Sequence, residues 1–107
     1  MENDEINLGD SIQLSGFKEI NSGEMIIIKK MIGSQVRKFQ DMIPDFERLK
    51  IYMKSVHKTG DHMQYEIHAD LIHAGKIMNA KSLDRNLFVT IADVLNKLEN
   101  SIKKYTQ

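Results

Sequence analysis

Lysine and arginine side chains that recur at helical spacing are the residues of this sequence best suited to binding chemistry. They are Lys30, Arg37 and Lys38 in one stretch and Lys97, Lys103 and Lys104 in another. Residues seven apart on a helix, such as Lys30 and Arg37, point in nearly the same direction. Grouped cations neutralise RNA phosphates and release bound counterions. The spacing therefore predicts a polyanion-binding surface if the two stretches lie side by side, although spacing alone favours a solvated helix face.

Histidines are the next candidates, because they could bind a metal. The four are His57, His62, His68 and His73. None forms the H-x-x-x-H pair of a helical metal site, and the odd spacing of His68 and His73 places them on opposite faces of a regular strand. There is no cysteine to supply a thiolate ligand. We therefore expect exposed histidines in loops and strands, with no metal and no cofactor.

Enzymatic chemistry is not indicated. Glu66 and Asp70 alternate along one predicted strand, where Lys50 or Lys54 could face them, so they indicate cross-strand ion pairs rather than an acid and base couple. The glycine-containing segments match neither a P-loop nor a dinucleotide-binding motif. No nucleophile is paired with a base. The sequence predicts a protein that is not an enzyme and has no small-molecule substrate.

Composition and charge place these residues in one small domain. The chain has 107 residues, of which 41% are hydrophobic, and it has no apolar run of the about 20 residues that a membrane span needs. Four acids and no base fall within residues 1–10, and taking these from the 15 acids of the chain leaves 11 acidic against 15 basic residues. We expect a flexible acidic tail over residues 1–10 and a mildly basic domain over residues 11–107. The acidic N-terminus is unlike a signal peptide, and the lack of cysteine fits the cytoplasm.

Two amphipathic helices and four strands must position the cations. Residues 21–43 repeat apolar side chains at spacings of three and four, with Asn21 as the cap and Pro44 after the end. Residues 84–105 repeat this pattern up to Tyr105, with Asp84 or Ser82 as the cap. The strands expected are residues 11–17, 48–54, 63–71 and 77–81. The order β-α-β-β-β-α predicts an α+β fold of two layers, in which both helices cover one face of a four-stranded antiparallel sheet.

The last strand and helix resemble a known family. Phe88 and Ala92 stand early in the helix, Lys97-Leu98-Glu99 follows, and Ile102-Lys103-Lys104 continues the basic pattern. An earlier strand contains Glu66-Ile67-His68-Ala69-Asp70. Together these segments are similar to the ribosome hibernation-promoting factor family, also called ribosome-associated inhibitors or ribosomal subunit interface proteins. The resemblance extends over residues 11–105 and agrees with the order of the elements.

The resemblance implies a role and a set of residues. Members of the family bind the small ribosomal subunit in the channel for mRNA and tRNA, and inhibit translation while ribosomes are idle under stress. Matching positions predict rRNA contacts by Arg37, Lys38, Lys97 and Lys104. The surrounding geometry adds Lys30, Lys81, Arg85 and Lys103. The expected partners are the small subunit and its rRNA, with no membrane, and the protein is expected to be a monomer off the ribosome. The chain resembles the short family members, so we expect no pairing of ribosomes through a second domain.

Two alternatives remain open at the level of sequence. A general double-stranded RNA-binding module could use a similar two-layer plan, since duplex RNA is read largely by shape. A protein–protein adaptor could instead use the open face of the sheet around Tyr52 and His68.

Overall fold

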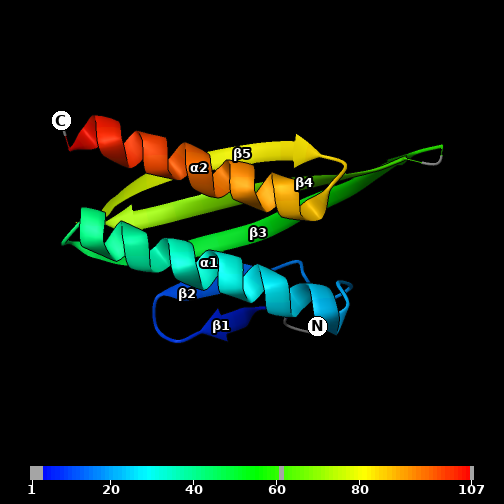
Figure 1. Ribbon diagram of the computed structural model, residues 1–107, viewed down its shortest axis with the longest axis horizontal. Coiled ribbons are helices and arrows are strands. Elements are labelled where there is room, and N and C mark those ends of the chain that lie inside the picture. The colour runs from blue at the N-terminus through cyan, green and yellow to red at the C-terminus, as the bar shows by residue number, and fades with distance from the viewer. Residues whose placement is uncertain (1–3, 61, 107) are drawn as a thin grey trace.

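Both helices lie side by side on one face of a single sheet. The computed structural model describes residues 4–60 and 62–106, with the side chains of residues 55–59 and 62 left aside. The elements are β1 (Ile6–Leu8), β2 (Ile12–Ser15), α1 (Ser22–Met42), β3 (Phe46–Thr59), β4 (His62–His73), β5 (Lys76–Asp84) and α2 (Leu87–Tyr105). Figure 1 shows α1 and α2 running in the same direction across the sheet. The predicted α+β class and two-layer arrangement are confirmed.

The sheet differs from the prediction in two respects. It has five strands in the order β1-β2-β3-β4-β5, not four, because Ile6 and Leu8 pair with Leu14 and Ile12 and form a short strand within the stretch expected to be a tail. It is also mixed rather than antiparallel, since β2 and β3 are parallel. The cause is α1, which returns the chain along the sheet so that β3 starts at the same end as β2.

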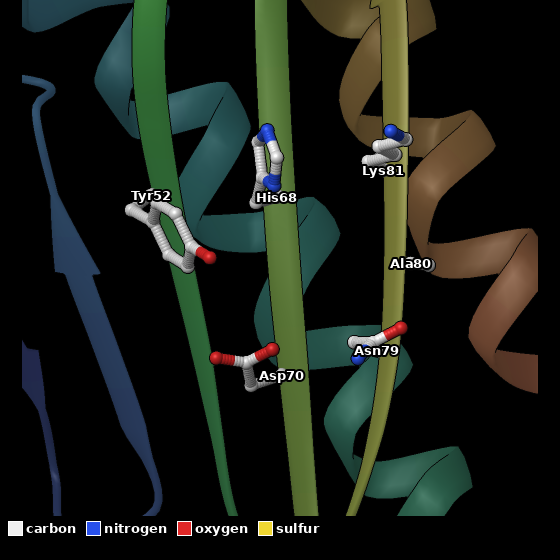
Figure 2. Close-up of a pocket in the computed structure, with 6 residues that line it drawn as sticks. All are labelled: Tyr52, His68, Asp70, Asn79, Ala80 and Lys81. Carbon is white, nitrogen blue, oxygen red and sulfur yellow. The ribbon is translucent and has the colours of Figure 1, made fainter.

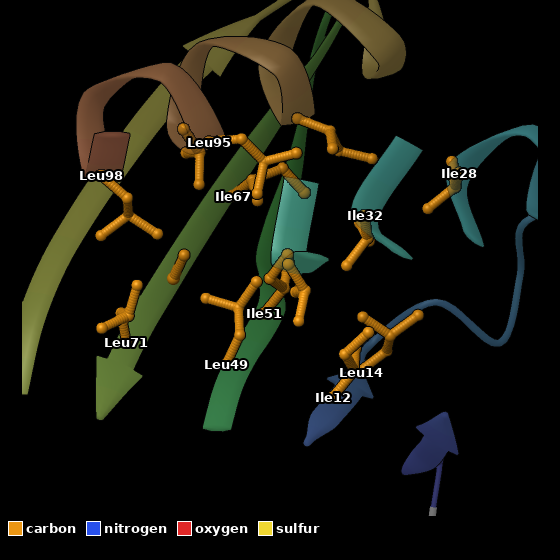
Figure 3. Close-up of a cluster of buried hydrophobic side chains, with 14 of the residues drawn as sticks. Ile12, Leu14, Ile28, Ile32, Leu49, Ile51, Ile67, Leu71, Leu95 and Leu98 are labelled. Carbon is orange, nitrogen blue, oxygen red and sulfur yellow. The ribbon is translucent and has the colours of Figure 1, made fainter. Parts of the chain in front are cut away.

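Alternation along the strands builds the core. Leu49 and Ile51 of β3, with Ile67 and Leu71 of β4, are at most 1% exposed and face the helices (Figure 3). The predicted helix stripes are confirmed at their apolar positions, which are Ile28, Ile32, Val36 and Phe39 in α1 and Leu87, Ile91, Leu95, Leu98 and Ile102 in α2. Tyr105 was expected in the stripe but is 49% exposed, because α2 ends there.

One helix cap and one histidine differ from expectation. Asn21 caps α1 as predicted, but α2 is capped by Asn86, whose side-chain oxygen accepts from the Val89 N–H at 3.1 Å. Asp84 and Ser82 are unable to cap because β5 continues through both. The prediction of exposed histidines is wrong for His73, which is 1% exposed and meets the Tyr105 ring edge-on at 4.9 Å. The side chains of His57 and His62 lie outside the described set.

Two glycines give opposite predictions for stability. Gly16 has φ of +82°, and a Cβ there would lie 2.5 Å from the Met53 carbonyl oxygen, whereas a Cβ on Gly33 in the middle of α1 would meet nothing within 4 Å. Gly16→Ala should therefore destabilise the protein by about 2–3 kcal/mol. Gly33→Ala should stabilise it by about 0.5–1 kcal/mol, because alanine restricts the unfolded chain and favours the helix. Urea unfolding of both variants measures these changes, and equal midpoints would contradict the local geometry.

Candidate nucleic-acid interface

The solvent side of the two helices carries most of the predicted cations. We call this the basic helix surface, and it comprises Lys30, Arg37 and Lys38 of α1 with Lys97, Lys103 and Lys104 of α2, all exposed. On α1, Lys30 and Arg37 border a shallow hollow of about 380 Å³, whose other lining residues are Lys29, Gly33 and Ser34. The absence of a side chain at Gly33 leaves room between the two cations. Such a hollow suits a group with several acceptor oxygens, such as a phosphate.

Glu99 joins the two helices from the α2 side. Its carboxylate accepts a hydrogen bond from Gln35 Nε2 at 2.8 Å and forms an ion pair with Lys38 Nζ at 3.0 Å. Both partners belong to α1. Lys103, one turn further along α2, reaches the second oxygen at 3.1 Å. The Glu99 side chain is 12% exposed, while those of Lys38 and Lys103 are 56% and 58% exposed. The Glu99 carboxylate therefore lies deep in the contact between α1 and α2, which we call the seam, and the two lysine ammonium groups lie nearer the solvent.

These contacts fix the charge of the seam. Hydrogen bonds from Gln35, Lys38 and Lys103, in that order of effect, lower the pKa of Glu99 from 4.5 to about 2. Glu99 is therefore ionised at any physiological pH. Two lysines against one carboxylate leave a net charge of +1 at the seam. The cluster both holds the helices together and contributes to the positive potential of the surface.

A second cluster fastens α2 to the sheet edge. Lys97 Nζ lies 3.1 Å from Asp93 and donates to the Lys81 carbonyl oxygen at 2.9 Å. The Ser82 hydroxyl donates to Asp93 at 2.6 Å. The Ser82 hydrogen bond and then the Lys97 contact lower the pKa of Asp93 below its usual value. Lys97 is thereby oriented along the α2–β5 junction rather than left to move freely.

The structure thus brings some predicted residues together and separates others. Lys38 meets Lys103 through Glu99, and Lys97 meets the backbone of Lys81. Lys30, Arg37 and Lys104 are exposed and have no hydrogen bond or ion pair within the part of the chain that the structure describes. Arg85 stands apart in the turn between β5 and α2, at the N-terminal end of that helix.

Sequence reasoning missed Gln35 and Glu99. Glu99 was noticed only within the Lys-Leu-Glu match, yet it lies four residues after Leu95 and three before Ile102, both in the buried stripe. A carboxylate at a core-facing position needs partners, because burial of an unpaired charge is costly. The core-facing position of Glu99 was therefore the feature of the sequence that could have identified it. Its partner Gln35 could be identified only from the helix packing.

Among the residues whose placement is described, no three His, Asp or Glu side chains gather as a metal site would require. No helix within the described ranges is long and apolar enough to cross a membrane.

The architecture is similar to that of two solved structures. A ribosomal subunit interface protein from Coxiella burnetii superposes with a TM-score of 0.60 at 15% identity, over 90% of this chain and 94% of that one. The N-terminal domain of Thermus thermophilus Protein Y superposes with a TM-score of 0.54 at 19% identity, over 94% and 99%. The chain shares its fold with these two proteins. No family model and no curated protein matches in sequence. The two solved structures confirm the predicted resemblance at the level of the fold.

Substitution of Glu99 should weaken the seam in a pH-dependent way. Glu99→Gln removes the charge that attracts Lys38 and Lys103, so we expect a loss of about 1 kcal/mol at pH 7. Because the folded pKa of about 2 lies below the unfolded value of 4.5, the stabilisation is complete above pH 4.5 and is lost as pH falls toward 2. Unfolding free energies of both proteins, measured from pH 7 to pH 2.5, should converge at low pH.

A matched control for this experiment is Asp41→Asn. Asp41 is an exposed carboxylate on α1, and no hydrogen bond or ion pair to it is found among the described residues. Its substitution should leave the pH dependence unchanged. A constant difference between wild type and Glu99→Gln across the pH range would show that the carboxylate is not held as described.

Proposed function

We propose that the protein binds the small ribosomal subunit through the basic helix surface and inhibits translation by occupying the channel for mRNA and tRNA. The observation that carries this proposal is the presentation of cations from two adjacent helices on one surface of this fold. The fold is shared with a protein described as a ribosomal subunit interface protein. Ribosomal RNA supplies the polyanion that such a surface fits.

The cations divide into two kinds that suit this task. Lys38, Lys97 and Lys103 are held by carboxylates of the protein, so their positions are largely set before RNA arrives and less conformational entropy is lost on binding. Arg37 and Lys104 are exposed, and no contact to either is found among the described residues, so they can move to meet phosphates. The guanidinium of Arg37 can also bind a phosphate through two hydrogen bonds.

Inhibition in this proposal is steric and needs no catalysis. The body measures 44 × 27 × 24 Å, and the helices are fastened to the sheet by the core and by the Asp93–Lys97 cluster. A rigid body of this size, bound through its helices, excludes other ligands from the space that it fills. The same proposal places the protein in the cytoplasm, as a monomer until it meets idle ribosomes under stress.

Charge reversal on the basic helix surface tests where the ribosome binds. Arg37→Glu combined with Lys104→Glu changes one cation on each helix and breaks no described ion pair, so the fold should persist. The affinity for purified small subunits in sedimentation assays should fall at least about tenfold. The slope of log affinity against log salt concentration should decrease in magnitude by about 2, because two phosphate contacts are lost. Retained binding would remove this surface from the mechanism.

A matched variant on the opposite face serves as the control. Arg48→Glu with Lys54→Glu makes the same change in net charge on exposed residues of β3 and should leave sedimentation with small subunits intact. Free duplex RNA of equal nucleotide concentration should compete poorly. Equal affinity for the duplex and for small subunits would favour a general double-stranded RNA-binding module instead.

Occupation of the channel predicts competition. Small subunits saturated with the protein should lose most of their binding to a model mRNA and to its cognate tRNA in filter assays. The Arg37→Glu, Lys104→Glu variant should not compete at the same concentration. Simultaneous binding of the protein, mRNA and tRNA would contradict occlusion while leaving ribosome binding in place.

A further inference from the structure

The face of the sheet away from the helices contains a polar hollow that the basic helix surface does not use. It has a volume of about 480 Å³ and spans β3, β4 and β5. Its lining residues are Tyr52, His68, Asp70, Asn79, Ala80 and Lys81, and we call it the open-face hollow. The volume falls within the range of about 300–1,000 Å³ typical of small-ligand sites.

Two rows of paired residues shape the hollow. Tyr52, His68 and Lys81 lie opposite one another across the three strands, and Asp70 lies opposite Asn79 in the adjacent row. Figure 2 shows Tyr52, His68 and Lys81 on three successive strands, with Asn79 on the β4 side of β5 and Asp70 on the β3 side of β4. The backbone at Ala80 closes the floor, since that side chain packs toward the core. The site is therefore built on regular strands and not on loops.

His68 presents a fixed aromatic face. Its ring stacks on Tyr52 with centroids 5.1 Å apart and planes at 19°, and its Nε2 lies 2.8 Å from Glu66. Because the two rings stack across β3 and β4, the second face of His68 is turned toward β5, where Asn79 and Lys81 stand. A planar group that entered the hollow would stack on this face beside Asn79, with Asp70 in the same row as Asn79 on β4.

Charge favours an anionic ligand. Among the described side chains at regularly paired positions of β3, β4 and β5, alternation places three cations and two carboxylates on this face, namely Arg48, Lys50 and Lys81 against Glu66 and Asp70. These groups match the parts of a nucleotide. The ring of His68 offers a stacking face for a base, the carboxylate and amide offer hydrogen bonds to its edge, and the lysine offers a cation for its phosphate. Unpaired RNA bases are recognised in this manner on sheet surfaces, by aromatic stacking and by hydrogen bonds to the base edge.

We propose that the open-face hollow binds an unpaired nucleotide of single-stranded RNA, with the base stacked on His68 and the phosphate beside Lys81. Asp70 accepts hydrogen bonds only, so it prefers a base with an exocyclic amino group, which adenine, cytosine and guanine have and uracil lacks. The protein then has two RNA-binding faces, one on each layer. This second face is independent of the proposed contact between the helices and the ribosome.

Binding of labelled hexamers A6 and U6, measured by fluorescence anisotropy, tests the proposal. Wild type should bind A6 more tightly than U6, and His68→Leu should weaken A6 binding about tenfold. Asp70→Asn, which keeps the size of the side chain, should narrow the preference for A6 over U6, because the amide nitrogen can also donate to a uracil carbonyl. Gln13→Ala changes a residue on the same face outside the hollow and should bind A6 normally.

The outcomes separate this site from the helices. The preference for A6 should persist in Arg37→Glu, Lys104→Glu, and His68→Leu should still sediment with small subunits. Equal binding of A6 and U6 by wild type, or unchanged A6 binding by both His68→Leu and Asp70→Asn, would overturn the proposal. Displacement of A6 by AMP at an equal nucleotide concentration would also overturn it, since the site would then take free nucleotides.

Discussion

The buried carboxylate of Glu99 is the interaction on which the arrangement of the helices depends. The apolar stripes of α1 and α2 hold both helices to the sheet, but such contacts are non-directional and tolerate sliding. Hydrogen bonds are directional, and Glu99 accepts from Gln35 and Lys38 on α1 and from Lys103 on its own helix. Because the anion is nearly enclosed, loss of these partners would leave a costly buried charge. This contact, together with the close-packed core, relates the position of Lys38 on α1 to that of Lys103 on α2.

The two faces of the sheet follow from the alternation of the strands. Successive side chains of a strand point to opposite faces of the sheet. Because Leu49, Ile51 and Ile67 are buried under the helices, their neighbours Lys50, Tyr52 and His68 point to the open face. The composition of the open face is thus coupled to the core by register. A slip of one residue would expose the core and bury the Tyr52–His68 stack together. Any ligand on the open face is therefore read by side chains whose positions the core itself fixes.

The sequence allowed the class, the layers and most of the core to be predicted, because apolar periodicity reports which side faces inward. It failed where the deciding contact was distant in the chain. The three residues of β1 gain a partner only because β2 offers a free edge, and α2 starts at Asn86 because β5 continues to Asp84. His73 was assigned to the exposed set, although its strand ends beneath α2 near Tyr105. For the interface, the cations could be predicted from residue types and spacing. The carboxylates that position these cations could be identified only once the packing of the helices was known.

A surface of paired charges is a reasonable way to bind RNA reversibly. If every cation were unpaired, self-repulsion would destabilise the helix pair, and binding would rest on side chains that must be ordered on contact. Glu99 and Asp93 reduce that repulsion and hold Lys38, Lys97 and Lys103, while Arg37 and Lys104 keep their charge for the ligand. The overall charge of the chain is zero, so the proposed attraction to RNA would have to arise from the placement of the charges. Binding of this proposed kind would fall steeply with salt. The proposed inhibition of translation would require that kind of reversible contact, since the protein would have to leave when translation resumes.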